Sequence, residues 1–209
     1  GDVVSPTVSL AAASPYWPLS TTVTLTVQAQ DEVGVTLVSL HEVPTETLGM
    51  RTAPPYTWTL PTGEEPALRT FVAQAYDAAH NLGQSPPYTV AVGFPHGQVS
   101  PAAFGLVLAA GEVATRTLTL QNAGYAPLTW DLAGSPPLWL APEPTGGEAQ
   151  PGEGQPITLT FQTEGLAPGV HTTTLTFAWN DPLAPERTVQ VGLRVAAQRR
   201  YLPLTLRGG

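Results

Sequence analysis

Residues 117–132 read TLTLQNAGYAPLTWDL and carry the clearest structural signal in the chain. Every second residue is apolar before the turn signal Asn-Ala-Gly and again after it, at Leu118, Leu120, Leu128, Trp130 and Leu132. A period of two is typical of β-strands, so the stretch predicts two antiparallel strands that pair with each other. Each strand has one apolar face, which is stable only when a second sheet covers it. We therefore predict a β-sandwich.

The same alternation recurs on both sides of this stretch. It predicts strands at residues 8–10, 20–29, 35–43, 56–60, 69–76 and 88–92, and later at 104–108, 155–163, 171–179 and 188–195. Residues 15–19, with two prolines, predict a turn. The fold class expected is all-β, with two consecutive immunoglobulin-like antiparallel β-sandwiches and strand-like terminal tails.

Domain boundaries follow from where the alternation stops. We expect one sandwich over residues 1–94, a second over 98–197 and a strand-like tail over 198–209. The linker GFPHG at 93–97 is short and contains a proline, so the two domains should sit end to end with restricted swing.

Composition excludes several classes of function. Charged residues are only 11% of the chain while hydrophobic residues are 42%, a balance that favours folded β structure over disorder. The net charge of −8, with arginine but no lysine, disfavours nucleic acid as a partner. There is no cysteine, which excludes disulfides and thiolate chemistry, and no apolar run is long enough to span a bilayer.

Three motifs in the first half resemble a known family. They are residues 29–35 (AQDEVGV), 54–58 (PPYTW) and 75–81 (AYDAAHN). Together they resemble the bacterial Ig-like repeats of exported enzymes and surface proteins, and the resemblance covers residues 5–93. His80 stands where that pattern usually has glycine.

The second half resembles the BACON and abnormal-spindle/hydin-like sandwiches of bacterial surface proteins. The resemblance rests on residues 99–101, 118–124, 128–130, 139–140, 151–152, 165–169 and 180–182. It implies a binding or spacer module without catalytic machinery. His171 follows the Leu-x-Pro-Gly turn where a tyrosine is usual, and we expect it to hydrogen-bond the backbone. The tail resembles the Tyr-Leu-Pro-Leu C-terminal tails of some exported bacterial proteins.

No catalytic motif occurs in the sequence. The four histidines, at 41, 80, 96 and 171, have no metal-ligand spacing, and no serine lies in a nucleophile motif. We expect no enzymatic activity.

Two aspartates mark a possible calcium site. Asp31 and Asp77 should end neighbouring strands, and with Glu32 and Asn81 they could supply oxygen ligands to Ca²⁺. The alternative is that each aspartate caps its own turn through backbone N–H groups, with no cofactor bound.

Aromatic residues raise a second possibility, a sugar-stacking surface. The positions of Trp58 and Trp130 within strands favour the core. Tyr16 and Trp17, in the proline-rich turn, are the residues expected to be exposed and able to bind a polysaccharide.

The tail has an apolar face of its own at Tyr201, Leu202, Leu204 and Leu206. It could pair with an edge of its own second domain, act as a sorting or processing address, or add as a strand to a neighbouring molecule. Strand addition between identical chains is head-to-tail and yields a fibre. Val8 and Leu10, near the other end of the chain, are the matching candidates for such a contact.

These features predict a non-catalytic module outside the cell or on its surface. We expect a subunit of a surface filament or layer, or an adhesive spacer, that binds itself head to tail by β-strand addition. The alternative is the C-terminal accessory region of a secreted bacterial hydrolase, which binds substrate or carbohydrate and belongs to a longer precursor.

Overall fold

The computed structural model describes residues 2–44 and 46–197, and within them it contains strands and no helix. Nine strands precede residue 94: β1 (Thr7–Ala11), β2 (Tyr16–Trp17), β3 (Thr22–Gln30), β4 (Val35–Glu42), β5 (Glu46–Arg51), β6 (Tyr56–Pro61), β7 (Ala67–Asp77), β8 (Leu82–Gln84) and β9 (Tyr88–Val92). Nine more follow: β10 (Gly97–Ser100), β11 (Ala103–Ala109), β12 (Val113–Asn122), β13 (Leu128–Ala133), β14 (Leu140–Glu143), β15 (Gly146–Ala149), β16 (Gly154–Gln162), β17 (Gly169–Trp179) and β18 (Glu186–Ala196).

The first nine strands form two facing sheets. One sheet has the order β1-β3-β6, and the other has the order β2-β9-β7-β4-β5, with β8 paired to β7. Most pairs are antiparallel, and the short β2 lies parallel to β9. The inner faces enclose a core in which Trp17, Leu25, Leu40 and Phe71 are almost completely buried.

The last nine strands form a second pair of sheets with a separate core. Their orders are β10-β12-β16-β14 and β11-β18-β17-β13-β15. Leu118, Leu128, Trp130 and Phe177 lie at the centre of this core. Two immunoglobulin-like β-sandwiches in succession confirm the predicted fold class.

The two strands of residues 117–132 do not pair with each other, and this part of the prediction is wrong. β12 pairs with β10 and β16, whereas β13 pairs with β15 and β17 in the opposite sheet. The connection 123–127 therefore crosses from one sheet to the other. Both apolar faces still point inward, so Leu118 and Leu120 are buried from one side and Trp130 from the other.

Asn122 holds this crossing in place. Its side chain is completely buried, and its amide nitrogen donates hydrogen bonds to the carbonyl oxygens of Ala126 at 2.8 Å and Ala149 at 3.0 Å. Its amide oxygen accepts hydrogen bonds from the backbone N–H groups of Gly124 at 3.0 Å and His96 at 3.3 Å. Both N–H groups and the oxygen of this buried amide are thus hydrogen-bonded, and these bonds fix the crossing and the linker.

Several short strands were not predicted from the alternation of apolar residues. β5, β8, β10, β14 and β15 were not predicted, and β2 lies inside the predicted turn at 15–19. β2 and β8 have only two and three residues, too few to show alternation, and β5, β10, β14 and β15 contain glycine or proline, which are depleted in strands.

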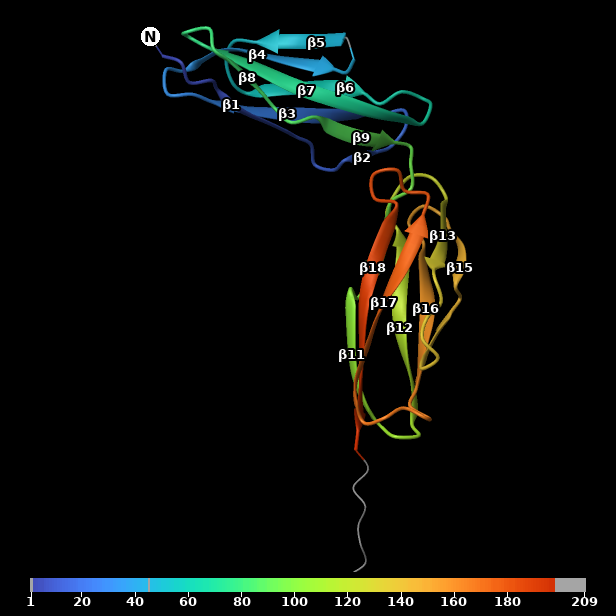
Figure 1. Cartoon of the computed structure of the whole chain (residues 1–209). Helices are drawn as coiled ribbons and strands as arrows, with labels where there is room; N and C mark the ends of the chain where they lie inside the picture. The colour runs from blue at the N-terminus through green and yellow to red at the C-terminus, as the bar shows by residue number, and fades with distance from the viewer. Residues whose placement is uncertain (1, 45, 198–209) are drawn as a thin grey trace, which may run out of the picture.

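Figure 1 shows that the two sandwiches meet through their ends at residues 93–97, with a bend at that point. Within residues 2–44 and 46–197, nothing forms a helix of the length and apolarity needed to cross a membrane.

Candidate functional site

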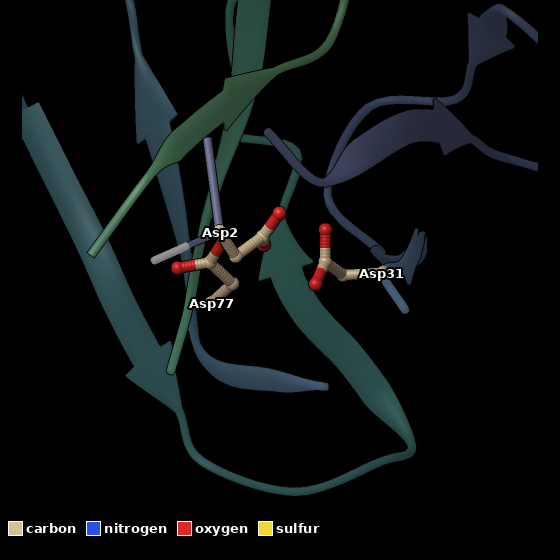
Figure 2. Close-up of side chains that lie close together, drawn as sticks. All are labelled: Asp2, Asp31 and Asp77. Atoms are coloured by element: carbon tan, nitrogen blue, oxygen red, sulfur yellow. The ribbon is translucent and has the colours of Figure 1, made fainter. Parts of the chain in front are cut away.

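Three aspartates from separate segments of the chain gather at one end of the first sandwich (Figure 2). Asp2 precedes β1, Asp31 follows β3, and Asp77 is the last residue of β7. One carboxylate oxygen from each lies within 4.8 Å of the others. Asp77 is almost completely buried, and Asp2 and Asp31 are partly buried.

Asp77 is held by the turn that follows it. Its Oδ1 accepts a hydrogen bond from the Asn81 backbone N–H at 2.8 Å, and its Oδ2 accepts one from the Asn81 side-chain amide at 2.7 Å. Burial acts to raise the pKa of the Asp77 carboxyl, but these hydrogen bonds outweigh it, so the pKa lies below its ordinary value. Asp77 is therefore a carboxylate at neutral pH.

The other two carboxylates are only partly satisfied. Asp31 Oδ1 accepts a hydrogen bond from the Val33 N–H at 2.9 Å, and Asp2 Oδ1 accepts one from the Val4 N–H at 3.1 Å. Asp2 Oδ2 is buried and has no hydrogen-bond partner. Asp31 and Asp77 thus cap their own turns, as the alternative reading of the sequence had it, and they also lie side by side.

The composition of the cluster differs from the sequence hypothesis in two residues. Glu32 is exposed and lies outside the group of three, and Asn81 serves as a donor to Asp77. Asp2 was not predicted. No local pattern marks it, because only the return of residues 2–6 to this end of the sandwich brings it there.

Gly83 sets the path of that N-terminal segment. The backbone of Pro6 passes so close that a Cβ atom on Gly83 would lie 1.9 Å from the Pro6 carbonyl oxygen. Pro6 itself is buried. The contact between β8 and the segment before β1 therefore requires a residue without a side chain.

His80 occupies a left-handed backbone conformation in the turn between Asp77 and Asn81, with φ of 67°. Since its side chain is exposed, replacing it with glycine removes strain without removing burial. We expect His80→Gly to raise the free energy of unfolding of the first sandwich by about 0.5 to 1 kcal/mol in urea titrations, after the entropy cost of glycine is subtracted. His80→Ala keeps the strain and should change little; equal stabilisation by both would contradict this explanation.

A second polar cluster lies where the two sandwiches meet. The buried carboxylate of Asp181, in the loop between β17 and β18, accepts a hydrogen bond from the Tyr16 hydroxyl of the first sandwich, at 2.8 and 2.9 Å from its two oxygens. It also accepts one from His96 Nδ1 at 3.0 Å. The rings of Tyr16 and His96 stack with their centroids 3.9 Å apart.

Asp181 also fixes its own loop and the linker. It accepts the backbone N–H groups of Gly97 at 3.2 Å, Leu183 at 3.0 Å and Ala184 at 3.2 Å. Burial, and then the hydrogen bond to Asp181 together with its negative charge, raise the pKa of Tyr16 well above its ordinary value. The Tyr16 hydroxyl therefore stays a donor over the whole physiological range of pH.

Backbone hydrogen bonds hold the linker against the second sandwich. The carbonyl of Phe94 accepts the Tyr125 N–H at 2.9 Å, and the carbonyl of His96 accepts the Ala123 N–H at 2.8 Å. A Cβ atom on Gly124 would lie 2.2 Å from the His96 nitrogen, so the linker crosses directly over this glycine. We call Tyr16, His96, Asp181 and these contacts the joint.

The predicted exposure of Tyr16 and Trp17 is wrong. Tyr16 is 7% exposed and belongs to the joint, and Trp17 is 2% exposed and packs in the first core. Their rings present no face for sugar stacking. The physical reason is that residues 16–17 form a strand beside β9, from which Trp17 enters the first core while Tyr16 is covered by Asp181 and His96. Trp58 and Trp130 are core residues, as predicted.

The remaining predicted residues are placed as follows. Val8 is buried in its own core and Leu10 packs against that core, so the side chain of Val8 is unavailable to a second molecule. His171 Nε2 donates to the Ala167 carbonyl at 2.9 Å, which confirms the predicted backbone bond. Tyr201, Leu202, Leu204 and Leu206 lie outside the described residues.

The arrangement nearest to a catalytic pair is on β4. Ser39 Oγ lies 2.8 Å from His41 Nε2, and His41 Nδ1 lies 3.1 Å from the Thr47 hydroxyl. Ser39 is almost completely buried. The group that orients the imidazole is thus a hydroxyl, where nucleophilic catalysis normally uses a carboxylate or amide.

Comparisons with known proteins give distant structural likenesses. No family model matches the chain, and no curated protein matches its sequence. The chain is similar to the ASH/PapD-like domain of human CEP192 (14% identity, 49% of this chain and 87% of that one, TM-score 0.42). It is also similar to a protein of unknown function from Porphyromonas gingivalis W83 (16% identity, 89% of this chain and 99% of that one, TM-score 0.38). A third similar structure is that of the fibronectin(III)-like modules of CbhA from Clostridium thermocellum (13% identity, 92% of this chain and 99% of that one, TM-score 0.38).

Proposed function

We propose that this chain is a non-catalytic structural module of an exported bacterial protein, acting outside the cell or on its surface as a spacer of fixed shape. In this proposal the first sandwich is a bacterial Ig-like repeat and the second is a BACON or hydin-like sandwich. The observation that carries the proposal is the joint, in which one buried carboxylate ties together the first sandwich, the linker and the second sandwich.

The construction of the joint supports a fixed angle between the sandwiches. A linker that allowed free swing would leave its backbone groups to water and its neighbours exposed. Here the Tyr16 hydroxyl, the His96 ring and the Gly97 N–H all converge on Asp181, which has almost no exposed surface. Opening the joint would break the hydrogen bond from the Tyr16 hydroxyl to Asp181 and the stacking of Tyr16 on His96.

We further propose that the module assembles head to tail, with residues 198–209 added as a strand to a neighbouring molecule. β1 is a suitable acceptor because it pairs with β3 alone and stands at the margin of its sheet. With Val8 turned into the core, the contact at β1 would use backbone hydrogen bonds along the edge that does not pair with β3.

The test compares the full chain with a chain that ends at Ala197. We expect filaments or large oligomers of the full chain in negative-stain electron microscopy and sedimentation velocity, and monomers of the shortened chain. Leu204→Asp in the full chain should also abolish assembly, because a charge would enter the apolar face of the added strand.

Small-angle scattering of the shortened chain should fit one bent arrangement of the two sandwiches.

Monomers in both samples would overturn the assembly proposal and favour the alternative, an accessory region of a secreted hydrolase. A scattering profile that requires a broad range of angles between the sandwiches would overturn the fixed spacer.

A further inference from the structure

We propose that Asp2, Asp31 and Asp77 bind one Ca²⁺ ion, which ties the segment before β1 to the turns after β3 and β7. The inference is separate from the spacer and its assembly, since it concerns the far end of the first sandwich. It replaces Glu32 of the sequence hypothesis with Asp2.

The spacing of the carboxylates suits a shared cation. Oxygen ligands lie about 2.3 to 2.6 Å from calcium, so two ligands of the same ion are at most about 5 Å apart. The three carboxylate oxygens here are within 4.8 Å of one another. Figure 2 shows the Asp2 carboxylate between those of Asp77 and Asp31.

An unpartnered buried oxygen points independently to a ligand. Asp2 Oδ2 is buried and makes no hydrogen bond, although Oδ1 of the same carboxylate accepts the Val4 N–H. A buried carboxylate oxygen without a donor or a cation is destabilising, because the charge has lost its water. A cation held between Asp2 and its two neighbours would supply the missing interaction.

The charge balance leads to the same conclusion. Over residues 2–44 and 46–197, the ion pairs are Arg69–Glu42 and His96–Asp181, and neither includes this cluster. Three carboxylates this close repel one another unless a cation lies among them.

The ligand chemistry selects calcium among the common cations. All three side-chain ligands are carboxylate oxygens, whereas structural zinc sites are normally built from cysteine and histidine, and magnesium is usually held by only one or two carboxylates. Calcium takes six to eight oxygens in flexible geometry. A groove of about 440 Å³, lined in part by Val4, Gln30 and Asp31, opens beside the cluster and leaves room for water ligands.

The experiment measures the unfolding temperature of the first sandwich by calorimetry, with the full chain, in calcium or chelator. A dissociation constant of about 1 mM, ordinary for extracellular modules, gives about a sixfold shift of the folding equilibrium at about 5 mM calcium. We expect a rise of about 5 °C for a domain of this size. Titration calorimetry should give one calcium per chain.

Asp2→Asn and Asp31→Asn are the informative variants, because asparagine keeps the side-chain oxygen that accepts the Val4 or Val33 N–H. Both should lose the response to calcium and, with less repulsion, melt at a higher temperature than the wild type in chelator. Glu32→Gln is the matched control: it removes one neighbouring charge outside the cluster and should respond like the wild type.

Three results would overturn the proposal. One is an unchanged calcium response in Asp2→Asn. Another is a loss of the response in Glu32→Gln equal to the loss in Asp2→Asn. The last is an equal rise with magnesium or with sodium chloride of the same ionic strength, which would reduce the effect to charge screening.

Discussion

Replacing Asn122 with alanine is expected to lower the free energy of unfolding of the second sandwich by about 4 kcal/mol, measured by urea titration. The buried amide makes four hydrogen bonds, to the carbonyls of Ala126 and Ala149 and from the N–H groups of Gly124 and His96. Alanine leaves four backbone groups without this partner in a site that has no exposed surface. Each buried group left unsatisfied costs about 1 to 3 kcal/mol, and water entering the gap recovers part of the loss.

Two further variants show whether hydrogen bonding is the cause. Asn122→Asp keeps the acceptor for Gly124 and His96 but cannot donate to the two carbonyls, and it buries a charge beside them, so we expect it to be at least as destabilising as alanine. Gln121→Ala, on the exposed face of the same strand, should cost less than about 0.5 kcal/mol. A loss below about 1 kcal/mol for Asn122→Ala would contradict the role assigned to this side chain.

Replacing Asp181 with alanine is expected to have the second large effect, a loss of about 3 kcal/mol from the second sandwich together with a freely swinging joint. The N–H groups of Gly97, Leu183 and Ala184 lose their acceptor, and so does the Tyr16 hydroxyl. The first three losses destabilise the second sandwich. The loss at Tyr16 separates the two sandwiches.

Tyr16→Phe distinguishes these two consequences because it removes only the hydroxyl that bridges the sandwiches. We expect this variant to keep the stability of the second sandwich and to broaden the distribution of interdomain angles seen by small-angle scattering. Glu186→Ala removes an exposed carboxylate near the joint and should leave both properties unchanged. Wild-type scattering from Asp181→Ala would show that the joint does not depend on this carboxylate.

The amino-acid sequence by itself determined which residues form the long strands and which faces are buried. Alternation of leucine with threonine in β12 places Leu118 and Leu120 inside, whatever the strand pairs with, because successive side chains point to opposite faces. The backbone bond of His171 was also expected, from the resemblance to sandwiches that have a tyrosine after the Leu-x-Pro-Gly turn. These features involve residues close together in the chain.

Tertiary structure alone decided how the strands are paired and which polar groups meet. The hairpin expected at residues 117–132 and a crossing between sheets have the same apolar pattern, and the buried amide of Asn122 favours the crossing by bonding Ala149, far along the chain. Asp2 lies beside Asp77, which is 75 positions away in the sequence. Tyr16 donates a hydrogen bond to Asp181, which is 165 positions away. Periodicity reports the direction of a side chain relative to its own strand. The partner it meets depends on the packing of distant segments, for which no local pattern exists.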